Sequence, residues 1–169
     1  MTESTTAPGQ DAPSEGGDTP SVDIAALVDS VRARLSVVLP QEWKTELTRW
    51  GGYAIGFENT IVFVDILENG DETVLRVSAP VVLDLRVTPE LCKFVATEFA
   101  GYYFGHAYLL ADDDDANIAH LYYKHSILGE SLDPAELHRV IGAVAWMGDA
   151  KSKEFKERFG GRLWSEETA

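Results

Sequence analysis

The sequence has little cysteine, few basic residues and no long apolar run. Among its 169 residues Cys92 is the only cysteine, which excludes an intramolecular disulfide and a zinc site built from several thiolates. No uninterrupted apolar stretch approaches the ~20 residues that a membrane-spanning helix needs, and the N-terminus lacks the basic and then apolar pattern of a signal peptide. These absences predict a soluble, cytoplasmic protein.

Basic residues are outnumbered two to one. The chain has 14 lysines and arginines against 28 aspartates and glutamates, a net charge of −14. An acidic surface repels phosphate backbones and anionic membranes, so neither nucleic acid nor a membrane is an expected partner. Basic, amphipathic or weakly charged protein segments are the partners that this charge favours.

The two ends differ in composition from the rest. Residues 1–20 contain no base, no aromatic residue and no large aliphatic residue after Met1. Such a segment buries too little apolar area to offset its ordering entropy, which predicts a disordered acidic tail. We expect residues 21–164 to form a single domain and residues 165–169 to fray.

Hydrophobic periodicity predicts helices near both ends of that domain. Apolar residues recur at three- and four-residue steps after Ser21, which indicates a first helix. The i, i+4, i+7 spacing of Trp43, Leu47 and Trp50 favours a short second helical piece, with a strand as the alternative.

Residues 53–85 change to the pattern of strands. The segments "YAIGF", "TIVFVDIL", "TVLRVSA" and "VVLDL" are short and rich in valine and isoleucine, and Asn69-Gly70 signals a hairpin turn. Ile61, Phe63, Asp65 and Leu67 alternate with Val62, Val64 and Ile66, so both faces of this strand are largely apolar. One face covers the core, and the other meets a helix or a partner.

The remaining elements complete an α+β pattern. Thr88 and Pro89 begin a helix, "HAYLLA" and "NIAHLYYKHSIL" form two strands, and Asp133 and Pro134 begin a last helix that ends at Gly160-Gly161. Strand runs that alternate with single helices predict an antiparallel sheet packed with helices, in the order α-β-β-β-α-β-β-α.

Four consecutive aspartates, Asp112 to Asp115, are the most site-like stretch. A helix-loop-helix calcium site alternates its ligands with spacers, has a glycine after them and ends in a glutamate. Here the acids are contiguous, no glycine follows, and Tyr123 occupies the twelfth position. The run therefore predicts a solvated hairpin loop.

Other candidate chemistry is weak. His106, His120 and Asp115 could approach one another on the last hairpin and hold a metal, but zinc needs three or four converging ligands, and His120 and His125 point to opposite strand faces. Cys92 lies near a helix N-terminus, and the alternative is a small buried core residue. The usual nucleophile, phosphate and zinc motifs are absent, so an enzyme is not expected and no cofactor is implied.

Several segments together resemble one known family. "SAPVVLDLRVTPELCKFV" and "GHAYLLADDDDANIAHLYYKHSILGESLDPAELHRVIGAVAWMGDAKSKEFKERFGG" resemble the YbjN-like proteins and their relatives, the peptide-binding chaperones of type III secretion systems. The resemblance covers roughly residues 75–161 and includes Asp149, while Gly148 departs from the alanine usual before it. It implies a type III secretion chaperone-like fold, a small acidic homodimer and the binding of client peptides without catalytic residues.

A peptide-binding module is therefore the leading hypothesis. Its expected surface is the apolar strand face with Tyr53, Val62, Val64, Ile66 and Val74. The alternatives are a small-molecule or metal-sensing regulator that uses the histidines of the last hairpin, and a purely structural dimerisation subunit. The many aromatic residues either fill the core or form such a contact surface.

Overall fold

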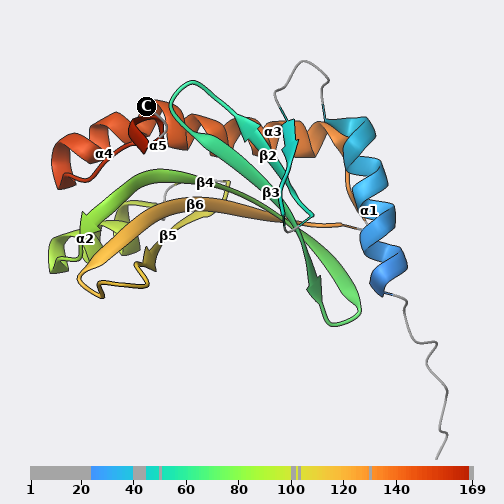
Figure 1. Cartoon of the computed structure of the whole chain (residues 1–169), viewed down its shortest axis with the longest axis horizontal. Helices are drawn as coiled ribbons and strands as arrows, with labels where there is room; N and C mark the ends of the chain where they lie inside the picture. Colours follow the sequence, from blue (N-terminus) through green and yellow to red (C-terminus); the bar gives the residue numbers. More distant parts are fainter. Residues whose placement is uncertain are drawn as a thin grey trace, which may run out of the picture.

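A curved antiparallel sheet forms the centre of the molecule, and most of the helices pack on one of its faces (Figure 1). The computed structural model describes residues 24–39, 45–49, 51–99, 102, 104–129 and 131–167. The predicted tail of residues 1–20, the N-cap Ser21 and the side chains of Trp43 and Trp50 lie outside this part of the chain.

The elements follow the predicted order, with short additions. The helices are α1 (Ile24–Val38), α2 (Pro89–Glu98), α3 (Pro134–Trp146), α4 (Ser152–Phe159) and α5 (Trp164–Glu167), and a π-helical segment (Met147–Lys151) joins α3 to α4. The strands are β1 (Thr45–Leu47), β2 (Tyr53–Gly56), β3 (Ile61–Asn69), β4 (Glu72–Arg86), β5 (His106–Ala111) and β6 (Ile118–Leu128). The α+β fold with an antiparallel sheet is thus confirmed.

The six strands are arranged in the order β1-β2-β3-β4-β6-β5, and every pair is antiparallel. Gly70, with φ +67°, lies in the tight turn between β3 and β4, where the sequence signals a hairpin. The central strand β4 pairs with β3 and then with β6, so it places residues from both halves of the chain side by side.

One sequence interpretation needs correction. The short helical piece around Leu47 is wrong, because Thr45–Leu47 form the edge strand β1 against β2, which was the alternative. The segments "TVLRVSA" and "VVLDL" form one strand, in agreement with the three strands of the predicted order, since Pro80 is accommodated at a register shift between β4 and β6 and does not end β4.

The predicted helix boundaries are confirmed where polar caps mark them. The Thr88 hydroxyl accepts a hydrogen bond from the Leu91 amide at 3.2 Å, and the Asp133 carboxylate accepts from the amides of Ala135 and Glu136. Gly160 ends α4 with φ +79°. After it, Trp164–Glu167 form the helix α5, which extends from the predicted domain into the residues from 165 on that the sequence predicts to fray.

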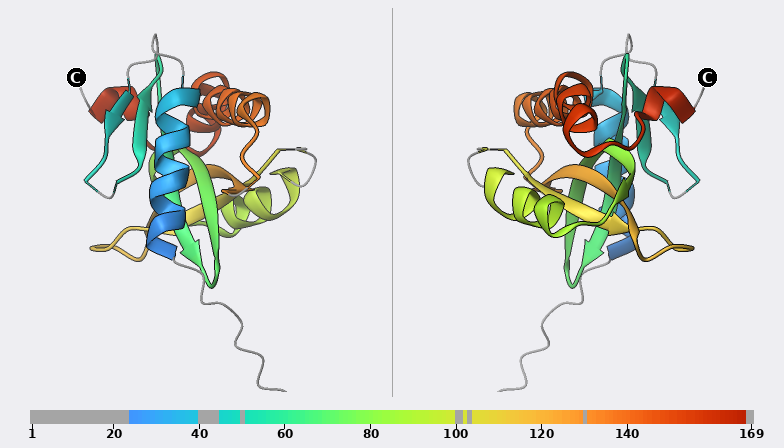
Figure 2. Two further views of the ribbon diagram at one scale, coloured as in Figure 1. Left: turned by 90° about the vertical axis from the view of Figure 1, so that its right-hand side faces the viewer. Right: turned by 90° about the vertical axis from the view of Figure 1, so that its left-hand side faces the viewer.

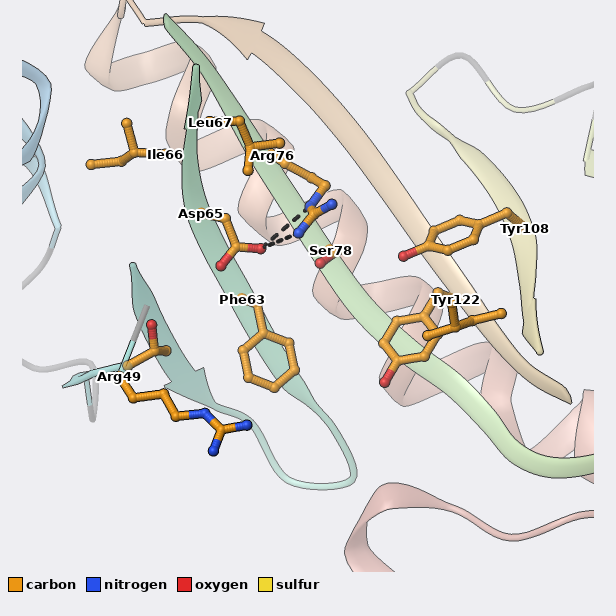
Figure 3. Close-up of a pocket in the computed structure, with 11 residues that line it drawn as sticks. Arg49, Phe63, Asp65, Ile66, Leu67, Arg76, Ser78, Tyr108 and Tyr122 are labelled. Atoms are coloured by element: carbon orange, nitrogen blue, oxygen red, sulfur yellow. Dashed lines mark hydrogen bonds and ion pairs between the residues drawn. The ribbon is translucent and has the colours of Figure 1, made fainter. Parts of the chain in front are cut away.

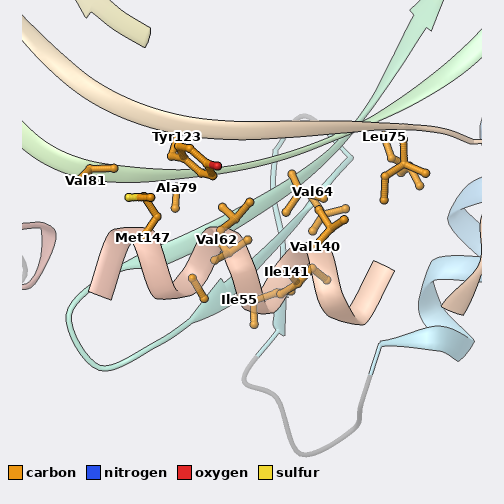
Figure 4. Close-up of a cluster of buried hydrophobic side chains, with 14 of the residues drawn as sticks. Ile55, Val62, Val64, Leu75, Ala79, Val81, Tyr123, Val140, Ile141 and Met147 are labelled. Atoms are coloured by element: carbon orange, nitrogen blue, oxygen red, sulfur yellow. The ribbon is translucent and has the colours of Figure 1, made fainter. Parts of the chain in front are cut away.

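The helices divide the sheet into two unlike faces. Side chains of α1, α2 and α3 pack on one face, which we call the core face, while the other face, the open face, is bordered by α5 (Figure 2). In Figure 4 the core face meets α3 through buried residues of the strands and of the helix: Ile55, Val62, Val64, Leu75, Ala79, Tyr123, Val140 and Ile141. In the described part of the chain, no helix is long and apolar enough to span a membrane.

Candidate functional site

A groove of about 640 Å³ lies on the open face of the sheet. It crosses the strands from the end of β1 to β5, as the close-up in Figure 3 shows. We call it the open-face groove and define it by its lining residues: Thr48, Arg49, Phe63, Asp65, Ile66, Leu67, Arg76, Ser78, Tyr108, Leu110 and Tyr122. Helices cover the opposite side of the same strands, so this is the accessible side.

Strand register explains why these residues meet. Directly opposite residues of an antiparallel pair point to the same face. Phe63 is paired with Ser78 and Asp65 with Arg76 across β3 and β4, and Tyr108 is paired with Tyr122 across β5 and β6. The groove floor is therefore assembled from two hairpins, β3–β4 and β5–β6, which α2 separates in the sequence.

Aromatic rings form the two ends of the groove. The rings of Tyr108 and Tyr122 stack with their centroids 5.8 Å apart, and the ammonium of Lys124 lies 4.8 Å from the Tyr108 centroid. At the other end Phe63 meets Trp164 of α5 edge to face, with centroids 6.1 Å apart. These contacts fix the rings in place, and each ring still contributes a flat apolar surface.

An ion pair lies between the aromatic ends. The Nε and Nη2 groups of Arg76 both donate to Oδ2 of Asp65, at 3.3 and 2.9 Å. Burial raises the pKa of Tyr108 above its ordinary value, an effect that Arg76 opposes and Asp65 reinforces. The Tyr108 hydroxyl is therefore neutral at physiological pH and within the electrostatic reach of the ion pair.

The aspartate run forms the turn between β5 and β6, as the sequence predicts. Asp112 accepts hydrogen bonds from the amides of Asp114 and Asp115 at 2.9 and 3.0 Å, and Asp115 accepts from the backbone and side chain of Asn117. The two amides, followed by His120, lower the pKa of Asp112. Asp113, Asp114 and Asp115 are exposed to solvent.

The hypothetical metal ligands do not converge. His120 accepts a hydrogen bond from the Asp84 amide and lies 3.3 Å from an oxygen of Asp112, whereas His106 pairs with Lys124 near the other end of β5. His106 is paired with Lys124, which lies four residues beyond His120 along β6, and four residues of strand correspond to roughly 13 Å. Within the described ranges, no group of three or more His, Cys, Asp and Glu side chains could hold a metal ion.

The residues expected to bind peptide occupy both faces. Val62 and Val64 are 0% exposed and belong to the core, and Tyr53 and Ile66 pack against that core while half-buried. Val74 is paired with Leu67, so it lies on the open face. The strand face chosen from the sequence is thus mainly the one that the helices cover.

The sequence nevertheless contains the signal that separates the two faces. Asp65 interrupts the apolar alternation of β3, and a charged residue in mid-strand favours the accessible side. Tyr108 and Tyr122 were not singled out as site residues, because only the pairing of β6 with β4 and of β5 with β6 brings them beside Phe63 and Asp65. Cys92 is exposed, in contrast to the core position considered for it.

Comparison with known proteins completes the description of the site. Residues 25–167 match the family model described as TY-Chap1: T3SS (YopN, CesT) and YbjN peptide-binding chaperone 1. No curated protein matches the chain significantly. The match covers every element of the structure, including all the strands that form the open-face groove.

Proposed function

Because the chain belongs to the TY-Chap1 family of T3SS and YbjN peptide-binding chaperones, we propose that it binds a segment of a client protein in the open-face groove. The proposed role is non-enzymatic: the groove holds the client segment, and the protein makes no covalent change to it. The proposed binding surface differs from the one expected from the sequence, because Val62 and Val64 lie beneath the helices.

The groove's position and lining support the proposal most strongly. Its volume of about 640 Å³ is within the range of ~300–1,000 Å³ that is typical of ligand pockets. Tyrosine, phenylalanine and arginine, which line it, are enriched at the centres of protein interfaces. An extended peptide lying across β3, β4, β6 and β5 would place its apolar side chains on Phe63, Tyr108 and Tyr122.

A second, shallower groove provides the competing location. Its volume is about 440 Å³, and its lining comes from α1 and from the residues around the start of α3: Ser30, Ala33, Arg34, Val37, Val38, Leu132 and Pro134. Val37 is 84% exposed. The described residues that line this groove include no aromatic side chain, so they offer a client fewer of the contacts that dominate binding energy.

Two matched substitutions distinguish the grooves. Leu110→Asp places a charge at the rim of the open-face groove, and Val37→Asp places one in the second groove, beside α1. Both side chains are exposed in the native protein, so both variants should fold. The probe is a fluorescein-labelled peptide selected on the unaltered protein by phage display. We expect Leu110→Asp to weaken binding at least tenfold and Val37→Asp to leave it unchanged. The reverse result would contradict the proposed location.

We also propose that residues 21–164 fold as one domain and that the protein acts in the cytoplasm as a homodimer without binding nucleic acid. The net charge of −14 supports the last point, because it opposes association with a phosphate backbone. Sedimentation equilibrium tests the dimer: a single monomeric species at micromolar concentration would contradict it.

A further inference from the structure

The charge inside the open-face groove differs in sign from the charge of the whole chain. The chain carries 28 acidic and 14 basic residues, whereas the described residues that line the groove include Arg49 and Arg76 against one acid, Asp65. Lys124 adds a further positive charge beside Tyr108. The groove is therefore a locally basic region on a strongly acidic protein.

Hydrogen-bond donors also exceed acceptors on the groove floor. Arg76 uses Nε and Nη2 for Asp65, and a guanidinium has five N–H donors in all, so donors remain for a ligand. The Arg76 side chain is 38% exposed, which leaves those donors accessible from the groove.

Ser78 provides a second polar group at the same place. Its position two residues after Arg76 on β4 puts both side chains on the open face, and Ser78 is only 5% exposed. Its hydroxyl lines the groove and is not among the buried polar atoms that lack a partner in the described part of the chain. A serine hydroxyl both donates and accepts hydrogen bonds, so Ser78 can bond to a ligand that lies in the groove.

Tyr108 faces Arg76 and Ser78 from the other side of the groove. In Figure 3 its hydroxyl points from β5 toward Ser78 and the Asp65–Arg76 pair. A guanidinium, a serine hydroxyl and a tyrosine hydroxyl thus surround one part of the groove. A carboxylate is the peptide group that suits them best, because it accepts hydrogen bonds without donating any, and a charged donor such as a guanidinium strengthens the hydrogen bond.

We infer that the open-face groove selects client segments in which an aspartate or glutamate lies next to an apolar residue. The carboxylate binds Arg76, Ser78 and Tyr108, and the apolar neighbour packs on Phe63 and Tyr122. This inference rests on the proposed function. Asp65 already occupies one side of Arg76, so it orients the guanidinium and also competes with the client's carboxylate.

Three labelled peptides test this selectivity. They share one apolar sequence and differ only in a central glutamate, glutamine or lysine, and fluorescence anisotropy measures their affinity for the full chain. A charge-assisted hydrogen bond predicts that the glutamate peptide binds about tenfold more tightly than the glutamine peptide. We expect the lysine peptide to bind most weakly.

Variants of the groove should change this preference in opposite directions. Arg76→Gln and Tyr108→Phe reduce the preference for glutamate, whereas Asp65→Asn removes the competing carboxylate and increases it. Arg139→Gln, an equal charge change on the exposed side of α3, leaves it unchanged. Thermal unfolding of each variant confirms that a loss of binding is not a loss of structure.

The outcomes separate this inference from the proposed function. Equal binding of the glutamate and glutamine peptides, or a preference for lysine, overturns the carboxylate selectivity while the groove remains a peptide site. If no peptide binds to the unaltered protein at millimolar concentration, both the inference and the proposed function are wrong.

Discussion

Asp149 binds Asn59 through two hydrogen bonds to a single carboxylate oxygen. Its Oδ1 accepts from the Asn59 backbone amide at 3.0 Å and from the Asn59 side-chain amide at 2.6 Å. Asp149 lies in the π-helical segment between α3 and α4, and Asn59 lies in the turn between β2 and β3. The pair therefore joins the helical layer to the sheet and holds β3 in the position that places Phe63 and Asp65 in the groove.

Loss of this pair should destabilise the fold. We predict that Asp149→Ala lowers the free energy of unfolding by about 1–3 kcal/mol, because two partly buried donors lose a charged acceptor. Urea denaturation followed by circular dichroism measures the change. Asp113→Ala, an exposed aspartate in the β5–β6 turn, is the matched control and should change stability by less than about 0.5 kcal/mol. Equal effects of the two substitutions would contradict the role given to Asp149.

Gly148 is required by the close approach of the same segment to the sheet. A Cβ atom at this position would lie 2.6 Å from the Thr60 hydroxyl and 2.9 Å from the Pro80 carbonyl oxygen. Thr60 donates a hydrogen bond to that carbonyl, so neither group moves away freely. We predict that Gly148→Ala lowers the free energy of unfolding by about 1–3 kcal/mol, the usual cost of overpacking.

Gly142 provides an internal comparison on α3. A Cβ there meets no atom within 4 Å, so Gly142→Ala should raise stability by about 0.5–1 kcal/mol through helix propensity alone. The opposite signs of the two glycine substitutions can be read from thermal melts of the purified variants. A stabilised Gly148→Ala protein would show that Thr60 and Pro80 do not confine this segment.

Val64 tests the division of the sheet into a core face and an open face. It is 0% exposed beneath α3, so Val64→Asp buries a carboxylate without a partner. We predict a loss of more than about 4 kcal/mol and failure to fold, seen as the loss of dispersed amide signals in NMR spectra. Leu110→Asp, on the open face, should keep the native spectrum. A folded Val64→Asp protein that only loses peptide binding would support the surface first expected from the sequence.

The sequence predicts this fold well wherever local signals decide an element. Thr88 and Asp133 mark helix starts through side-chain caps, and the alternation of residues 61–67 shows a strand with two usable faces. The continuity of β4 through Pro80 is different, because it depends on register shifts against β6 that no local pattern contains. Short edge strands such as β1 are equally hard to predict, since pairing with β2 and not local periodicity decides them.

The candidate site is less predictable than the fold for the same reason. Its floor combines Asp65, Arg76 and Tyr108, which come from three strands and meet only after β4 pairs with β3 and β6 and β6 pairs with β5. Periodicity identifies the two faces of β3, but it does not say which of them α3 covers. The packing of α3 against one face decides that, and this packing exists only in the folded chain.

His106 provides a test of the electrostatics along β5. Its burial lowers its pKa below the ordinary 6.5, and the charges of Lys124 and His125 lower it further. We predict that Lys124→Met raises the pKa of His106, measured by an NMR titration of the imidazole signal, and that Lys153→Met on α4 does not. An unchanged pKa in Lys124→Met would contradict this contribution.

The lowered pKa also has a consequence for stability. Below pH 6.5 the unfolded chain binds a proton at this histidine more readily than the folded chain, so this group destabilises the fold as the pH falls toward the folded pKa. His106→Asn should therefore lose less stability than the unaltered protein between pH 7 and pH 5. A steeper loss in the variant would show that the charged imidazole is favoured in the fold.

Chemical-shift mapping of the unaltered protein tests the central claim most directly. A glutamate-containing apolar peptide is titrated into isotopically labelled protein, and the amide signals of every described residue are followed. The account predicts that the largest changes occur at the lining of the open-face groove, above all at Phe63, Arg76, Ser78, Tyr108 and Tyr122. Changes confined to α1 and the start of α3, or no change at millimolar peptide, would contradict it.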